Sequence, residues 1–232
     1  MPLAKKIALI IGGCILFGGR KAPMQDPLTY LALGDSYTIG QSVSEDDRYP
    51  TQVVRRLRSD GFYYTAPDII AATGWTTGDL LNAMPDSTLD RPPNGPKDRH
   101  YHVVSLLIGV NDQYRAYTQS EYRTQFTELL QRSIHLAGDN PSHVIVLSIP
   151  DYSVTPFVQG RDRAYIAAQI DSFNVINKEV AISYHTAWLD ITGESRKAAY
   201  DPSLIASDSL HFSGKEYAIW AEMMEPVMRA VR

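Results

Sequence analysis

The sequence contains a single cysteine, Cys14, among its 232 residues. One cysteine cannot form a disulfide within the chain, and it cannot supply a zinc site built from several thiolates. A disulfide-stapled fold and dithiol redox chemistry are therefore excluded. The acidic run Glu45-Asp46-Asp47 is followed by Arg48, a pattern typical of a solvated loop. We predict no metal site and no cofactor.

Positive charge is also scarce. Lys and Arg number 22 against 26 Asp and Glu, which gives a net charge of −4 and a pI near 5.8. No stretch interleaves basic and aromatic side chains as nucleic-acid-binding surfaces do. We therefore predict no nucleic-acid partner.

The sequence lacks an apolar run of the roughly 20 residues that a membrane-spanning helix needs. A shorter run follows Lys5 and Lys6 and reaches Phe17, which is typical of an export signal. Residues 11–14 resemble a bacterial lipobox, in which the cysteine becomes lipidated. We expect residues 1–22 to be an export or lipoprotein-type segment that directs the protein to the periplasm or cell envelope, with Cys14 as a candidate membrane anchor. A hydrophobic start on a cytoplasmic protein is the alternative.

Buried strands alternate with amphipathic helices along residues 23–232, which we expect to form one domain. The predicted strands are 30–33, 68–72, 103–108, 144–149 and 188–191, and the predicted helices are 49–57, 76–84, 120–136, 163–181 and 214–231. Ser120 is the predicted cap of the third helix. This alternation predicts an α/β three-layer sandwich, with a parallel sheet of about five strands covered by helices on both faces. No internal repeat interrupts the pattern.

Candidate functional residues follow the first three predicted strands. Ser36 comes after the first strand, Gly74 after the second and Asn111 after the third. Ligands of open α/β sheets bind beyond the carboxyl ends of the strands, so these residues should meet at one edge. The neighbouring carboxylates are given structural roles: Asp35 should cap the turn that presents Ser36, and Asp112 can cap the following segment.

A serine hydroxyl is a weak nucleophile that needs an imidazole to take its proton and a carboxylate to orient that imidazole. Asp208 and His211 lie three residues apart before the last predicted helix, so one loop can hold both. None of the other histidines has an Asp or Glu three residues before it. Because Ser36 is not within a G-x-S-x-G elbow, the sequence argues against an α/β-hydrolase fold.

Gly34-Asp35-Ser36, Gly74, the Gly109-x-Asn111-Asp112 segment and Asp208-x-x-His211 together resemble the SGNH (GDSL-like) hydrolase family. The resemblance covers residues 30–231 and implies a flavodoxin-like fold. It also implies that Ser36 is the nucleophile, His211 the base and Asp208 the acid. The implied oxyanion hole consists of the backbone N–H groups of Ser36 and Gly74 and the side-chain amide of Asn111. The leucine that usually follows the serine is Tyr37 here.

The resemblance implies a serine esterase that cleaves carboxylic esters through an acyl-enzyme, with a lipid or an acylated sugar as its small-molecule substrate. Lysophospholipase-like or short-chain acyl ester hydrolysis, carbohydrate deacetylation and a cell-surface binding module on the same fold remain open. Residues 113–119 and 151–161 are expected to border the acyl pocket. Trp75, Tyr152 and Phe157 follow strand ends and could line an acyl or sugar subsite.

Overall fold

The structure is a computed structural model that describes residues 26–84 and 100–231. Five strands form one parallel sheet in the order β2-β1-β3-β4-β5. Their bounds are β1 Tyr30–Gly34, β2 Asp68–Ala71, β3 Val103–Leu107, β4 Val144–Leu147 and β5 Ala187–Leu189. The central strands β1, β3 and β4 are buried throughout, whereas the edge strands β2 and β5 are half-buried. Because both faces of a parallel sheet are covered, its central strands are continuously apolar.

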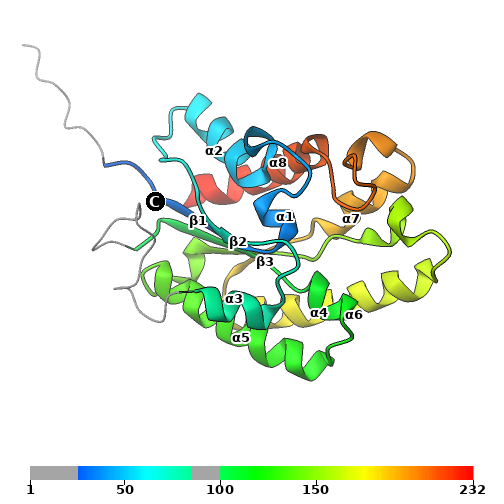
Figure 1. The fold of residues 1–232 in the computed structure, drawn as a ribbon. Helices are drawn as coiled ribbons and strands as arrows, with labels where there is room; N and C mark the ends of the chain where they lie inside the picture. Colours follow the sequence, from blue (N-terminus) through cyan, green and yellow to red (C-terminus); the bar gives the residue numbers. More distant parts are fainter. Residues whose placement is uncertain (1–25, 85–99, 232) are drawn as a thin grey trace, which may run out of the picture.

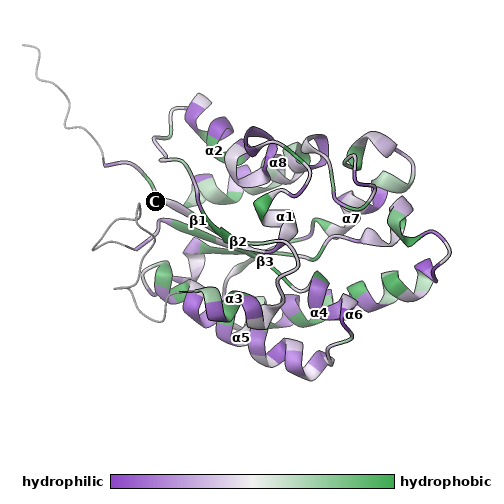
Figure 2. Cartoon of the chain, viewed as in Figure 1, coloured by the Kyte–Doolittle hydropathy of each residue, from purple (hydrophilic) through white to green (hydrophobic). Residues whose placement is uncertain are grey.

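Helices cover both faces of this sheet (Figure 1). The helix α2 (Tyr49–Ser59) packs against α8 (Gly214–Ala230) on one face. The other face carries α3 (Thr77–Ala83), α5 (Gln119–Leu136) and α6 (Arg163–Ser183). Figure 2 shows apolar strands between helices whose outer surfaces are largely hydrophilic. The predicted three-layer α/β sandwich is confirmed.

Short helices follow three of the strands, and the sequence pattern did not predict them. They are α1 (Ser36–Ile39), α4 (Val110–Tyr114) and α7 (Thr192–Ser195). Each is four or five residues long, so it shows no amphipathic period that a sequence can reveal. Two of them, α1 and α4, begin at or beside predicted site residues.

One predicted helix cap is wrong. The N-cap of α5 is Thr118, not Ser120, because the Thr118 hydroxyl accepts from the backbone N–H of Glu121. The Glu121 carboxylate in turn accepts from the backbone N–H of Thr118, which completes a capping box. Thr76 caps α3 by the same reciprocal pattern with Asp79.

An aromatic cluster joins α8 to the first turn after β1. The rings of Tyr37 and Phe212 are 5.8 Å apart, and those of Phe212 and Trp220 are 5.6 Å apart. All three side chains are buried. Phe212 directly follows His211, so this packing anchors the loop that carries the predicted acid and base.

The predicted N-terminal segment 1–22, with Cys14, lies outside the described residues. Among the helices at 26–84 and 100–231, none is both long and apolar enough to cross a membrane.

Candidate active site

The turn between β1 and α1 presents Ser36 as the first helical residue. Gly34 is required just before it, because a Cβ there would overlap the Thr38 hydroxyl and the Leu107 carbonyl oxygen. The Asp35 side chain accepts a hydrogen bond from the Tyr37 N–H at 3.0 Å, which confirms its predicted capping role. Ser36 is thus held by close packing at the carboxyl end of β1.

Burial raises the pKa of the Asp35 carboxyl to about 8. The nearby carboxylate of Asp112 adds to that shift, whereas the Tyr37 N–H opposes it. The second Asp35 oxygen is buried, and no described residue hydrogen-bonds it. A carboxyl with this pKa is mostly neutral at pH 7, which suits a structural group better than an orienting anion.

The loop before α8 brings Asp208 and His211 into direct contact. His211 Nδ1 lies 2.6 Å from Asp208 Oδ2. Asp208 Oδ1 accepts from the backbone N–H groups of Leu210 at 3.0 Å and His211 at 2.9 Å. Ser209 completes this tight turn with a left-handed backbone, at φ 66°. The three-residue spacing therefore lets one turn hold the carboxylate and the imidazole in a fixed relative orientation.

Ser42 is a further contact of this pair that sequence reasoning missed. Its hydroxyl donates to Asp208 Oδ2 at 2.6 Å, the same oxygen that faces His211. Partial burial works against ionisation of Asp208, but the donors from Ser42, Leu210 and His211 outweigh it and hold the pKa of this carboxyl well below its usual range. Asp208 is therefore an anion throughout the neutral pH range. No sequence motif links positions 42 and 208.

Gly74 lies in the loop between β2 and α3, and its left-handed backbone, at φ 84°, favours glycine. Asn111 of α4 and Arg115, which directly follows that helix, hold this loop from beyond the end of β3, two strands away in the sheet. Arg115 donates to the Gly74 carbonyl oxygen at 2.8 Å, and Asn111 Nδ2 donates to the Trp75 carbonyl oxygen at 2.9 Å. An amide nitrogen carries two hydrogens, so Asn111 can make one further donation.

Asp112 does not cap the segment that follows it, which corrects that interpretation of the sequence. Its buried carboxylate accepts from the Thr77 backbone N–H at 3.0 Å and from the Thr77 hydroxyl at 2.5 Å. Thr77 is the first residue of α3. The contact therefore ties the loop that contains Gly74 to the helix that contains Asn111.

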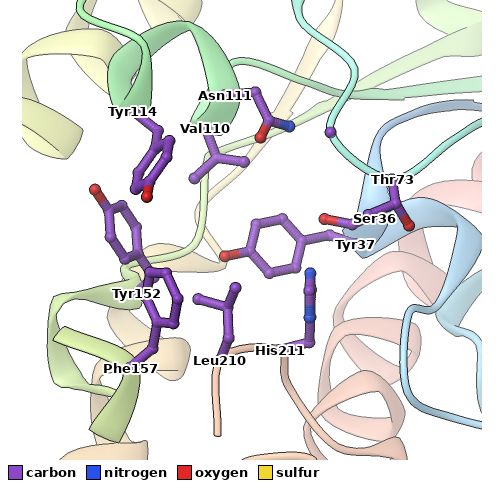
Figure 3. Close-up of a pocket in the computed structure, with 11 residues that line it drawn as sticks. Ser36, Tyr37, Thr73, Val110, Asn111, Tyr114, Tyr152, Phe157, Leu210 and His211 are labelled. Carbon is purple, nitrogen blue, oxygen red and sulfur yellow. The ribbon is translucent and has the colours of Figure 1, made fainter. Parts of the chain in front are cut away.

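A cavity of about 180 Å³ connects the predicted residues. Ser36, Gly74, Asn111 and His211 all line it, with Asp208 behind His211. Figure 3 shows the Ser36 hydroxyl and the His211 ring on the same side of this cavity, with the Asn111 amide across from His211. The structure thus brings together all five predicted site residues.

The cavity extends from Ser36 to an aromatic wall. Tyr37, Val110 and Leu210 lie between Ser36 and that wall, which consists of Tyr114, Tyr152 and Phe157 (Figure 3). The wall comes from the segments 113–119 and 151–161, as predicted. Trp75 does not line this cavity; its backbone accepts from Asn111 instead.

The arrangement contains the groups that nucleophilic acyl transfer needs: a hydroxyl, an imidazole with a carboxylate partner, and amide donors around one cavity. No metal-binding cluster of three or more His, Cys, Asp or Glu side chains occurs in the part of the chain that the structure describes.

Several solved structures share this fold. The TesA structure superposes with a TM-score of 0.67 at 17% identity, over 88% of this chain and 99% of that one. A lipase/acylhydrolase from Enterococcus faecalis gives a TM-score of 0.63 at 20% identity, over 88% and 97% of the two chains. Axe2, an acetylxylan esterase from Geobacillus stearothermophilus, gives 0.62 at 18% identity, over 87% and 94%.

No curated protein shows a significant sequence match to this chain. The profile of the GDSL-like lipase/acylhydrolase family, however, matches residues 32–219, which include all five site residues and most of the described domain. The chain therefore belongs to the GDSL-like lipase/acylhydrolase family and is an ester hydrolase.

Proposed function

We propose that Ser36 is the nucleophile of this hydrolase, with His211 as general base and Asp208 as the group that orients His211. The contact between His211 Nδ1 and Asp208 Oδ2, 2.6 Å long beside the Ser36 cavity, is the observation that carries the proposal. His211 takes the Ser36 proton as the hydroxyl oxygen attacks the ester carbonyl. It then gives that proton to the departing alkoxide, which leaves an acyl-enzyme.

Three donors stabilise the oxyanion in the proposed mechanism: the backbone N–H groups of Ser36 and Gly74 and the free Nδ2 hydrogen of Asn111. They are held before the substrate arrives, because Asn111, Asp112 and Arg115 fix the loop of Gly74 against α4. Donors fixed in advance need no reorganisation as charge develops. Water activated by His211 then attacks the acyl-enzyme, releasing the acid and regenerating Ser36.

The size of the cavity favours a short acyl group. Pockets that bury drug-sized ligands typically occupy about 300–1,000 Å³. The cavity at Ser36 is about 180 Å³ and ends at Tyr114, Tyr152 and Phe157. A long alkyl chain would meet this wall and remain largely in water. We therefore propose acetyl or similarly short acyl esters as substrates, in keeping with the structural similarity to Axe2, an acetylxylan esterase.

Replacing Ser36 with alanine should abolish hydrolysis of nitrophenyl acetate. We expect kcat to fall by at least about 10,000-fold, because no other group can form the acyl-enzyme. The control is Ser44→Ala, which removes an exposed hydroxyl that donates to Asp47 and does not line the cavity. Steady-state hydrolysis by the purified proteins checks this, and activity in Ser36→Ala equal to that of the control would overturn the assignment.

Lengthening the acyl chain should lower activity. In a nitrophenyl ester series from acetate through butyrate and octanoate to dodecanoate, we expect kcat/KM to fall by about tenfold or more between the first and the last ester. The reason is that a chain too long for the cavity meets the aromatic wall and cannot easily place its carbonyl at Ser36. Methylenes left in water also gain none of the roughly 0.8 kcal/mol that a buried methylene contributes. A steady rise in kcat/KM with chain length would contradict the proposed short-chain preference.

Removing the Ser42 hydroxyl should weaken catalysis without weakening substrate binding. For Ser42→Ala we expect kcat to fall by roughly tenfold with KM nearly unchanged, since a hydrogen bond to a charged group contributes about 1.5–3 kcal/mol. The acid limb of the pH–kcat profile should shift to higher pH, because Asp208 loses a donor, its pKa rises, and its carboxylate is therefore protonated at a higher pH than in the parental protein.

Ser42 has a left-handed backbone, at φ 66°, so strain must be separated from the hydroxyl. Ser42→Gly removes the hydroxyl and relieves any strain. Equal losses in Ser42→Ala and Ser42→Gly, with Ser44→Ala at the parental rate, would assign the effect to the hydrogen bond. Full activity in Ser42→Gly would show that this bond is dispensable.

We also propose that residues 1–22 direct export and that Cys14 is the lipid anchor. The support is the sequence pattern alone: Lys5 and Lys6, then the apolar run to Phe17. In bacterial cells supplied with labelled palmitate, we expect the parental protein, expressed from the full sequence, to carry label in the membrane fraction. The Cys14→Ser variant should carry none. Unlabelled protein in the cytoplasmic fraction would contradict this proposal.

A further inference from the structure

Exposed aromatic side chains gather around the active-site cavity. Five Phe, Tyr or Trp side chains are exposed among the described residues, and three of them, Tyr114, Phe157 and Tyr165, lie at this end of the molecule. Tyr114 and Phe157 form part of the aromatic wall, and Tyr165 is 62% exposed on the first turn of α6. Apolar surface left exposed beside a cavity is typical of ligand-binding grooves.

A second cavity, of about 220 Å³, lies on the far side of that wall. Tyr114 and Tyr152 line both cavities, so the two are neighbours with a shared partition. The α6 side of the second cavity carries Tyr165 and Gln169, which are four residues apart and therefore on one helix face. Gln113 lines it from α4, where its side-chain oxygen accepts from the Tyr152 hydroxyl at 3.0 Å.

The lining of the second cavity differs in chemistry from the first. Aromatic rings alternate with planar polar side chains: Gln113, Gln169, Arg161 and Asp162. An alkyl chain placed there would lie against these polar groups and keep water away from them, which is costly. The cavity therefore does not fit an extension of the acyl chain.

An anionic group also fits poorly. Arg161 is present, but its guanidinium lies over the Tyr114 ring, 5.3 Å from the ring centre. The carboxylate of Asp162 lines the same cavity, where it caps α6 by accepting from the Tyr165 N–H at 2.9 Å. The negative charge of Asp162 would repel a phosphate or carboxylate bound in this cavity. Of the three ligand classes, the one that fits this cavity is a neutral ligand with hydroxyl groups and an apolar face.

We propose that the second cavity is a subsite for a sugar ring, one unit away from the sugar that bears the scissile ester. The faces of a pyranose carry C–H groups that can stack on Tyr165 and Tyr114, while its hydroxyls can pair with Gln113 and Gln169. Tyr114 is exposed and lines both cavities, so the ring that bears a short acyl ester can approach Ser36 past Tyr114 while the next ring lies in the second cavity. The substrate class is thus a short-chain ester of an oligosaccharide. This inference rests on the proposed esterase function of Ser36.

The test compares two acetyl esters that differ by one sugar ring: an acetylated monosaccharide and the corresponding acetylated disaccharide, both assayed with the full chain. We expect the second ring to raise kcat/KM by about tenfold, the range in which one apolar contact discriminates between substrates. Tyr165→Ala and, independently, Gln169→Ala should remove most of that gain. The control is Tyr200→Ala, which truncates a 93% exposed tyrosine outside both cavities and should keep the gain.

Any of several results would overturn the subsite: no gain from the second ring in the parental protein, a full gain in Tyr165→Ala and Gln169→Ala, or a Tyr165-dependent gain from lengthening the acyl chain. An Arg161-dependent preference for an acyl glycerophosphate over the disaccharide ester would also overturn it, in favour of an anion site. Hydrolysis of nitrophenyl acetate, which has no sugar ring, tests the esterase proposal separately from the subsite proposal. If the protein cleaves it through Ser36 but gains nothing from the second ring, only the subsite fails.

Discussion

The buried carboxylate of Asp112 determines how two strand-end loops meet. It accepts from both the backbone and the hydroxyl of Thr77, so the start of α3 cannot move independently of α4. Gly74 precedes that start, and Asn111 is the residue before Asp112. Burial raises the pKa of this carboxyl, and the two Thr77 donors offset only part of that shift. The same contact therefore stabilises the fold and sets the distance between two proposed oxyanion donors.

On the other side of the cavity, a small set of contacts fixes the loop that carries Asp208 and His211. Asp208 accepts from its own loop, from His211 and from Ser42, so its charge is stabilised from several directions. Phe212 is buried beside Tyr37 and fixes the loop against the turn that carries Ser36. The proposed nucleophile, base and acid are thus positioned by contacts between two short loops. A parallel sheet places those loops at one edge, because the carboxyl ends of its strands all lie there.

The fold and the candidate site differ in how far sequence alone predicts them. The strands were predictable because continuous burial requires apolar runs, and Ser36, Gly74 and Asn111 were predictable because they follow those runs. Asp208 and His211 were found through their local spacing. Ser42 was not, because a contact across 166 positions leaves no local pattern. The cap of α5 was predictable but missed: Glu121 stands three residues after Thr118, which is the capping-box spacing.

The central claim is that Ser36 is the activated nucleophile. The most direct measurement is to treat the folded protein with a fluorophosphonate, digest it and map the adduct by mass spectrometry. A phosphonyl group on Ser36, formed at a rate that falls sharply in His211→Ala, is the predicted result. A folded protein that stays unlabelled, or one that is labelled on a different residue, would contradict the account.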